Sequence, residues 1–314
     1  MDRIDLKHKD KLFPSSECGL VLGNFDGVHQ GHKALIAQLR HKKAELGAAF
    51  PLGAFCFTEP PARYFGTPVG RLTDNAKKIE LFRREGLQFV IFCDFERVVD
   101  LSPEEFVKDV LVRECDCRLA VCGYNYTFGK HAAGTAEHLA ALLGTQPGRA
   151  VSIVPPVMDG RHAVSSSLIR ERLLQGHPED AARMLGRPYS LEGEVTRGKR
   201  LGRSLGFPTA NLTFPGDALI PAKGVYAVTV RLGKQTYLGI SNVGVRPSFD
   251  DGDHVTCETH LFDFSGDLYG RRLEVSFLKF LRDERSFCSV DELREQLHKD
   301  AQDALAYFMP PLYS

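Results

Sequence analysis

Two histidines close a glycine-rich segment near the start of the sequence, where residues 23–32 read G-N-F-D-G-V-H-Q-G-H. Glycine lacks a Cβ atom, so Gly23 and Gly27 let the backbone turn sharply after a strand and approach a ligand closely. His29 and His32 would then stand at a helix start, where free amides and the helix dipole favour an anion. Imidazoles placed there can donate hydrogen bonds to phosphate oxygens and to charge that develops in a transition state.

These histidines also have simpler explanations. An isolated H-x-x-H on a helix is typical of exposed first-turn residues or of a pair of metal ligands. The glycine-rich turn directly before His29 and His32 favours phosphate binding over both. A second segment, residues 164–170 (V-S-S-S-L-I-R), belongs with it. Its serines would cap the amides at a helix start, or the same hydroxyls and amides, with Arg170, would bind a triphosphate.

A basic, glycine-rich loop occupies residues 197–207, which read R-G-K-R-L-G-R-S-L-G-F. Its glycines allow backbone amides to converge on phosphates, and its basic side chains supply positive charge. The loop is not a P-loop, because its lysine is not followed by serine or threonine at a helix start. A basic surface loop without a ligand is the alternative. The residues expected to meet phosphates are Gly198, Lys199, Gly202, Arg203 and Gly206.

Hydroxyl and amide oxygens follow directly, in residues 207–212 (F-P-T-A-N-L). Thr209 and Asn211 are two positions apart, so an extended backbone places both side chains on one face. Hard oxygen donors of this kind suit Mg²⁺, which usually keeps several water ligands. The sequence therefore predicts a magnesium site at Thr209 and Asn211, directly after Pro208.

Short apolar runs alternate with helical patterns up to about residue 175. This alternation predicts a Rossmann-like α/β domain, with a parallel sheet covered by helices on both faces. In such sheets, ligands bind beyond the carboxyl ends of the strands, where the first glycine-rich turn falls. The expected strands are 19–25, 52–57, 89–93, 118–123 and 151–154, and the expected helices are 33–46, 75–85, 103–114 and 136–143.

From Tyr189 onwards, the segments are rich in β-branched and aromatic residues and are separated by turns without helices. This pattern is typical of an antiparallel β-barrel or sandwich. A C-terminal helix follows, which Ser289 and Glu292 would start as a capping box. We expect two domains, residues 1–182 and 183–314. The expected strands of the second are 191–196, 224–232, 236–242, 256–261 and 272–280.

The formal net charge is zero, with 40 basic and 40 acidic residues, and neither expected domain has a basic excess. Nucleic-acid binding is therefore not expected, because it needs cations to neutralise backbone phosphates. The eight cysteines show no paired C-x-x-C spacing, which indicates reduced, mostly buried thiols. No apolar run is long enough to span a membrane, and no signal-peptide pattern is present. We expect a cytoplasmic monomer or weak homo-oligomer that binds small molecules.

Residues 23–32 and 165–170 together resemble the nucleotidyltransferase superfamily, in which a histidine pair and an S-S-x-x-I-R helix bind ATP. Residues 197–212 closely resemble the G-R-x-L-G-F-P-T-A-N-L signature of riboflavin kinase. The ordered pair of modules resembles the bacterial bifunctional riboflavin kinase/FMN adenylyltransferase family over nearly the whole chain. The resemblance implies ATP-dependent phosphorylation of riboflavin to FMN, then adenylylation of FMN to FAD with release of pyrophosphate. It also implies Mg²⁺ in both halves.

The resemblance assigns roles to individual residues. Glu258 would be the general base that takes the proton from the 5′-hydroxyl of riboflavin. His29 and His32 would align the reacting phosphate groups and offset their negative charge during adenylyl transfer. The implied ATP-binding residues are Gly23, Phe25, Asp26, Gly27, His29, His32, Asn125, Ser165, Ser166 and Arg170 in the first domain, and Gly198, Lys199, Gly202, Arg203, Gly206, Pro208, Thr209 and Asn211 in the second.

Two departures from the family pattern fall in residues 123–134, which read G-Y-N-Y-T-F-G-K-H-A-A-G. Asn125 stands where the family has an aspartate, and an amide lacks the negative charge of a carboxylate. Ala132 stands where the family has an arginine, which removes a planar phosphate donor. We therefore hypothesise adenylyl transfer that persists but is weaker than in typical relatives. The alternatives are a riboflavin kinase with a degenerate first domain and a flavin-binding regulator without turnover.

Overall fold

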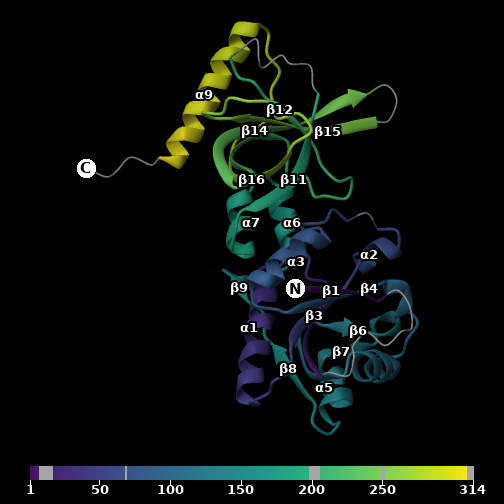
Figure 1. Ribbon diagram of the computed structural model, residues 1–314. Helices are drawn as coiled ribbons and strands as arrows, with labels where there is room; N and C mark the ends of the chain where they lie inside the picture. The colour runs from purple at the N-terminus through teal and green to yellow at the C-terminus, as the bar shows by residue number, and fades with distance from the viewer. Residues whose placement is uncertain (7–16, 68, 198–205, 249–251, 310–314) are drawn as a thin grey trace. The chain divides into compact units, whose positions relative to one another are not determined.

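The computed structural model describes residues 1–6, 17–67, 69–197, 206–248 and 252–309 (Figure 1). The chain divides into two compact units, Met1–Ser166 and Ser167–Ser314. The domain boundary expected from the sequence, between residues 182 and 183, falls later in the chain, inside helix α7 (Pro178–Leu185). Helix α6 (Ser166–Leu174) begins at the division between the compact units.

A six-stranded parallel sheet forms the first unit. Its strand order is β1-β4-β3-β2-β5-β8, so β2 lies between β3 and β5. The sheet confirms the expected parallel α/β domain and adds an edge strand, β1, that the sequence analysis did not predict. The strands are β1 (Asp2–Leu6), β2 (Cys18–Leu22), β3 (Leu52–Phe57), β4 (Phe89–Cys93), β5 (Cys117–Gly123) and β8 (Ala150–Val154).

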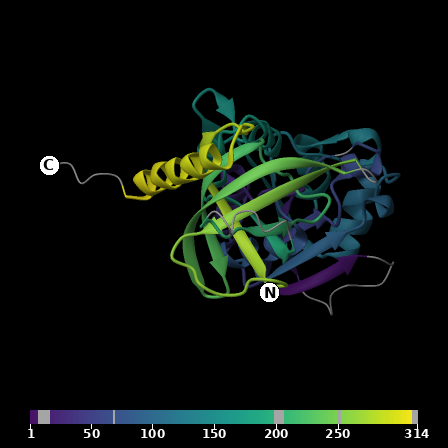
Figure 2. The ribbon, with the colours of Figure 1, turned by 90° about the horizontal axis from the view of Figure 1, so that it is seen from above.

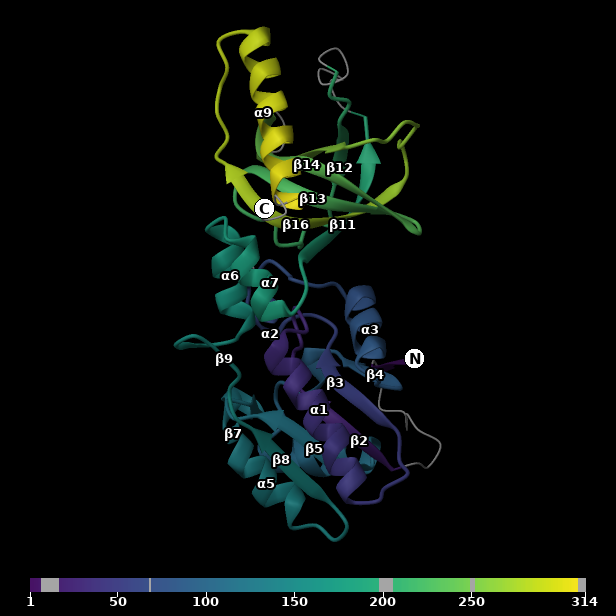
Figure 3. The ribbon, with the colours of Figure 1, turned by 90° about the vertical axis from the view of Figure 1, so that its left-hand side faces the viewer.

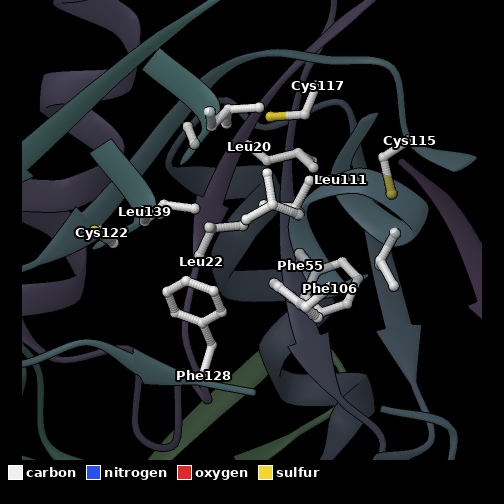
Figure 4. Close-up of a cluster of buried hydrophobic side chains, with 14 of the residues drawn as sticks. Leu20, Leu22, Phe55, Phe106, Leu111, Cys115, Cys117, Cys122, Phe128 and Leu139 are labelled. Carbon is white, nitrogen blue, oxygen red and sulfur yellow. The ribbon is translucent and has the colours of Figure 1, made fainter. Parts of the chain in front are cut away.

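Helices cover both faces of this sheet. They are α1 (Gln30–Glu45), α3 (Asn75–Arg84), α4 (Pro103–Glu105) with its continuation η2 (Phe106–Glu114), and α5 (Ala136–Gly144). Successive strand residues point to opposite faces. Val21 accordingly packs with α1 and α3, whereas Leu20 and Leu22 pack with η2 and α5. Figure 3 shows α1 lying across its face of the sheet, and Figure 4 shows the opposite core around Leu22 and Phe106.

The third expected helix begins as predicted but changes type. Ser102 and Glu105 form the capping box, with Glu105 N to Ser102 Oγ at 3.2 Å and Ser102 N to Glu105 Oε2 at 2.8 Å. After one α-helical turn the chain continues as a π-helix, in which the Cys115 N–H donates to the Val110 carbonyl. The remaining short elements are α2 (Pro61–Tyr64), η1 (Phe95–Arg97), β6 (Thr127–Phe128), η3 (Lys130–Ala132), β7 (Gly134–Thr135), β9 (Met158–Asp159) and β10 (His162–Ala163).

A closed antiparallel barrel dominates the second unit, which confirms the expected fold. Its strand order is β11-β12-β15-β14-β13-β16. Along β11, Tyr189, Leu191, Gly193 and Val195 are buried and alternate with more exposed residues, as the two-residue period requires. The strands are β11 (Tyr189–Thr196), β12 (Ala210–Thr213), β13 (Gly224–Leu232), β14 (Gln235–Ser248), β15 (Gly252–Leu261) and β16 (Arg272–Arg282).

The C-terminal helix α9 (Val290–Phe308) lies along one side of the barrel (Figure 2). Arg282 at the end of β16 binds the buried carboxylate of Asp300 with two hydrogen bonds, of 2.8 and 2.7 Å. Ser289 Oγ accepts the Glu292 N–H at 3.1 Å, as expected. The Glu292 carboxylate, however, accepts the N–H of Cys288 rather than that of Ser289, so the expected capping box is only half formed.

All eight cysteines are free thiols; seven are buried and Cys288 is exposed. Burial raises the pKa of Cys93 and of Cys122 to about 12, so these thiols stay protonated at neutral pH. This agrees with the expected reduced, mostly buried thiols. Among the helices in the described part of the chain, none is both long enough and apolar enough to cross a membrane.

Candidate active sites

The turn between β2 and α1 carries the first candidate site. Phe25 and Val28 have φ angles of 54° and 40°, and Gly27 has 85°. Left-handed φ values are unfavourable for residues with a Cβ atom, and most of all for a β-branched side chain such as valine. A turn of this kind persists only where its surroundings hold it, and such turns cluster at functional sites.

The contacts that hold this turn come from two other segments. The Asp26 carboxylate accepts the N–H groups of Leu72 and Thr73, each at 3.0 Å. The Gly27 N–H donates to Thr73 Oγ1 at 2.9 Å, and Ser166 Oγ donates to the Asp26 carbonyl at 2.8 Å. Asp26 and Ser166, both expected to bind ATP, therefore also shape the turn itself.

His29 and His32 cap each other at the start of α1. His29 is the N-cap residue: its N–H donates to His32 Nδ1 at 3.3 Å, and the His32 N–H donates to His29 Nδ1 at 3.4 Å. The two rings stack, with centroids 3.6 Å apart. Because each Nδ1 accepts a hydrogen bond, a neutral ring carries its proton on Nε2. Both imidazoles are thus arranged to donate from Nε2.

Electrostatics favour the neutral form of His32. Burial holds the pKa of His32 well below its usual value, and the neighbouring His29 and Lys78 lower it further. At neutral pH, His32 is therefore an uncharged Nε2–H donor rather than an imidazolium. Phe25, another expected ATP ligand, is completely buried, and its ring lies 4.9 Å from the His32 ring and 5.3 Å from that of Phe82.

The other expected residues of the first domain lie at the same sheet edge or on α6. Gly23 directly follows β2, and its N–H donates to the Phe55 carbonyl at 3.2 Å. Asn125 is exposed just beyond the carboxyl end of β5, which neighbours β2. Ser165 is half-buried directly before α6. Arg170 stands on α6 in the second compact unit.

The second candidate site is built on three adjacent barrel strands. Asn211 of β12 pairs directly with Glu258 of β15, and Glu258 pairs on its other side with Asn242 of β14. Directly paired residues lie on the same face of a sheet. On β12, Ala210 and Leu212 are buried, so Asn211 lies on the outer face of the barrel. Glu258 is therefore flanked by two amide side chains.

Two cavities meet at Thr209. The smaller has a volume of about 220 Å³ and contains Glu258 and Asn242, and α9 forms part of its wall. The larger, of about 660 Å³, contains Pro208 and the segment 264–269. Thr209 lines both. The smaller cavity is lined by Phe207, Thr209, Val225, Ile240, Asn242, Glu258, His260, Arg282, Glu284, Arg285, Phe287, Leu293, Leu297 and Asp300.

The start of β12 is fixed by contacts of His260. Its Nδ1 lies 2.8 Å from the Pro208 carbonyl, and its ring packs edge-on against Phe207 at 5.1 Å. Gly206 has a φ of 83°, a left-handed value that favours glycine. The other expected residues of the basic loop, Gly198, Lys199, Gly202 and Arg203, lie outside the described residues.

Sequence reasoning missed Thr73 and Lys78, which support the first turn, and Asn242, which flanks Glu258. Thr73 lies in the segment R-L-T-D directly before α3, and nothing local indicates that it reaches Gly27, 46 residues earlier. Asn242 falls inside a predicted strand, but its pairing with Glu258 is set by the register of β14 and β15. Strand register between distant segments is the missing information.

Known protein families match each half of the chain. A FAD synthetase family model matches residues 14–168, and a riboflavin kinase family model matches residues 185–308. The bifunctional riboflavin kinase/FMN adenylyltransferase of Bacillus subtilis is 32% identical and covers 98% of each chain. The Pseudomonas fluorescens protein of the same name is 37% identical, over 93% of this chain and 94% of its own. The chain belongs to the bifunctional riboflavin kinase/FMN adenylyltransferase family.

A solved structure has the same two-part fold as this member of the bifunctional riboflavin kinase/FMN adenylyltransferase family. It is described as a macrolide-efflux protein from Streptococcus pneumoniae, and it matches with a TM-score of 0.88 and 31% identity over 100% of both chains. The match covers both the parallel sheet and the barrel of this chain. The two family models leave residues 169–184 unmatched, a stretch that contains most of α6 and α7.

Proposed function

We propose that residues 183–314 phosphorylate riboflavin to FMN, and that residues 1–182 adenylylate FMN to FAD and release pyrophosphate. One observation carries this proposal: Asn211, Glu258 and Asn242 are paired side by side on three adjacent strands. Glu258 and Asn242 line the smaller cavity, and Thr209 lines both this cavity and the larger one. A carboxylate such as that of Glu258, next to the junction of two cavities, suits phosphoryl transfer between two bound substrates. The reciprocal histidine cap supports the second reaction.

In the kinase reaction, the 5′-hydroxyl oxygen of riboflavin attacks the γ-phosphorus of ATP, and ADP leaves. Glu258 accepts the hydroxyl proton as the new P–O bond forms. Riboflavin occupies the smaller cavity, because Glu258 and apolar side chains line it, and the phosphates of ATP reach Thr209 from the larger one. Phosphoryl transfer depends mainly on alignment and charge neutralisation, so the geometry around Thr209 matters as much as the base.

Thr209 and Asn211 would hold Mg²⁺ through a hydroxyl and an amide oxygen, and the ion would neutralise phosphate charge. The alternation of Thr209 and Asn211 with buried Ala210 and Leu212 supports a shared face for the two proposed ligands. In the described part of the chain, no group of three or more histidine, cysteine, aspartate or glutamate side chains is suited to a metal. Water and phosphate oxygens would therefore complete the shell, which is typical of Mg²⁺.

In the adenylyl transfer, a phosphate oxygen of FMN attacks the α-phosphorus of ATP, and the bond to the bridging oxygen breaks to release pyrophosphate. The FMN phosphate is already a nucleophile, so no general base is needed. His29 and His32 donate from Nε2 to phosphate oxygens, whose charge increases in the transition state. The proposed ATP ligands of this domain also include Gly23, Gly27, Asn125, Ser165 and Arg170.

We further propose that the protein works in the cytoplasm as a monomer or weak homo-oligomer that binds no nucleic acid. Eight free cysteines are in keeping with a reducing compartment. The zero net charge provides no general attraction to a polyanion. Size-exclusion chromatography over a range of protein concentrations tests the oligomeric state.

The deciding experiment incubates the protein with riboflavin, ATP and Mg²⁺, and separately with FMN, ATP and Mg²⁺, and resolves the flavins by chromatography. Production of FMN and FAD in the first mixture, and of FAD in the second, is the expected result. FMN without FAD would leave only the kinase. Binding of flavin without either product would instead favour a regulatory protein.

A further inference from the structure

Lys78 places a buried amine beneath the histidine turn, and burial lowers the pKa of this amine. Its side chain, on α3, is only 1% exposed, and its Nζ donates to the carbonyl oxygen of Asn24 at 3.0 Å. Within the described residues, no carboxylate lies at ion-pair distance from this amine. Burying an ammonium group without a carboxylate partner is costly, and apolar residues of similar size usually serve packing better. Packing alone therefore does not explain a lysine here.

Charged and titratable groups surround Lys78 on several elements. Cys56 faces it from β3, Asp26 from the histidine turn, and Glu59 and Arg71 from the segments between β3 and α3. The Cys56 thiol is neutral, because burial raises its pKa to about 11. The two carboxylates attract the ammonium group and the guanidinium group repels it, without any direct pair. Among the residues that the structure describes, the hydrogen bond to the Asn24 carbonyl is thus the specific contact of Lys78.

The hydrogen bond to the Asn24 carbonyl connects Lys78 to His32 through Phe25. The Asn24 carbonyl belongs to the peptide that precedes Phe25, whose φ of 54° is left-handed. The ring of Phe25 lies 4.9 Å from the ring of His32. We propose that Lys78 is a positioning residue for adenylyl transfer: it holds the Asn24 carbonyl and thereby the Phe25 ring against which His32 packs. This inference rests on the proposed function of the first domain.

The charge on Lys78 gives this arrangement a measurable signature. His32 faces two titratable groups, His29 and Lys78, and both lower its pKa in addition to burial. Removing the lysine charge should therefore let the titration midpoint of the His32 imidazole rise. An uncharged side chain at this position would not lower this midpoint.

The test compares Lys78→Met with Lys77→Met, a control on the same helix whose amine pairs with Glu80. FAD formation from FMN, FMN formation from riboflavin, and thermal unfolding are measured on each full-length variant. The His32 ring is followed by NMR and assigned through His32→Gln. We expect Lys78→Met to lower the turnover number for FAD formation by about tenfold or more, the order of a lost transition-state contact. Kinase activity should not change, the His32 midpoint should rise, and Lys77→Met should match the wild type.

The inference would be overturned if Lys78→Met formed FAD at a rate within about twofold of the wild type. It would also be overturned if this variant lost FAD formation while the titration midpoint of His32 stayed unchanged. If Lys78→Met unfolds the first domain, Lys78→Arg, which keeps the charge and a donor, decides the matter. FAD formation restored above that of the methionine variant supports positioning, and activity as low as in that variant overturns it. Absence of FAD formation in the wild type would refute the proposed function instead, and the His32 titration would still test the positioning.

Discussion

Asn211 and Glu258 are direct partners across β12 and β15, on the outer face of the barrel. The pairing places the carboxylate next to an amide oxygen that is proposed to bind Mg²⁺, and next to the junction of two cavities at Thr209. A general base must reach the hydroxyl proton, and the metal must reach the phosphate that the hydroxyl attacks. The fixed register of β12 and β15 would bring the proposed base and the proposed metal ligand side by side.

Glu258→Ala should abolish most FMN formation while ATP still binds. Loss of a general base typically reduces the rate by about 10²–10⁴-fold. ATP affinity, measured by calorimetry, should remain close to that of the wild type, because Glu258 lines only the smaller cavity. Glu194→Gln is a suitable control, since Glu194 is exposed on β11 and lines neither cavity. Near-normal turnover of riboflavin in Glu258→Ala would rule out the assignment.

Asn211→Leu and Thr209→Val should each shift the Mg²⁺ dependence of FMN formation to higher concentrations. Each substitution removes one oxygen ligand, and loss of a metal-site partner typically costs about 10–100-fold in affinity or activity. Thr209→Ser keeps the hydroxyl and should retain most of the activity. The measurement is the steady-state rate of FMN formation at saturating ATP over a series of Mg²⁺ concentrations. Mg²⁺ curves that coincide for the wild type and both apolar variants would contradict the proposed site.

The strands and helices were largely predictable, because burial imposes local periodicity. In β2, the continuous apolar run predicts a strand buried on both faces, and the structure packs Leu20 and Leu22 in one core and Val21 in the other. The edge strand β1 was not predictable in this way. Its five residues pair with β4, more than 80 positions away, and alone they carry too little pattern. Short segments that depend on a distant partner are the ones that sequence reasoning misses.

The same limit applies to the sites. The spacing of the histidine pair and of the Thr209–Asn211 pair within one segment predicts their chemistry. The structure places the histidines at the start of α1, as expected, and the roles of both pairs stay predictions. Glu258 came from family resemblance, since a glutamate on a strand is most often an exposed residue. Asn242 and Lys78 could be found only from three-dimensional contacts. Asn242 is the neighbour of Glu258 through the register of β14 and β15. Lys78 contacts Asn24, which lies 54 residues earlier in the chain. Positioning residues are generally harder to predict than ligands, because their contacts are with the protein.

The neutral state of His32 predicts how the first domain responds to pH. Its folded-state pKa lies well below 6.5, so adenylyl transfer should keep its rate as the pH falls from 7 towards 6 and decline only when His32 gains a proton. The free energy of unfolding should also decrease as the pH falls. Below the unfolded-state pKa of about 6.5, the unfolded chain binds the proton more readily, so the folded state loses stability as the pH falls. His32→Asn, which stays neutral, should remove this contribution.

Rates of FAD formation and thermal unfolding, measured from pH 5 to 8 on the wild type and on His32→Asn, check this prediction. The variant should lose about 10²–10³-fold in rate, as when an oxyanion donor is removed. Kinase activity of the same chains serves as the internal control. A rate that rises as His32 is protonated would show that an imidazolium, rather than a neutral donor, takes part.

Ala132 offers a direct test of the hypothesis that adenylyl transfer is weakened. It is exposed and has a φ of 55°, and alanine already has a Cβ atom in this left-handed conformation, so arginine adds no new backbone strain. Ala132→Arg should restore a planar phosphate donor and raise kcat/KM for FAD formation by about tenfold, the lower end of the range for a hydrogen bond to a charged group. The neighbouring His131→Arg is the matched control, because His131 is also exposed, with a φ of 57°. The hypothesis fails if the wild type already forms FAD as fast as the Bacillus subtilis relative, or if both arginine variants respond alike.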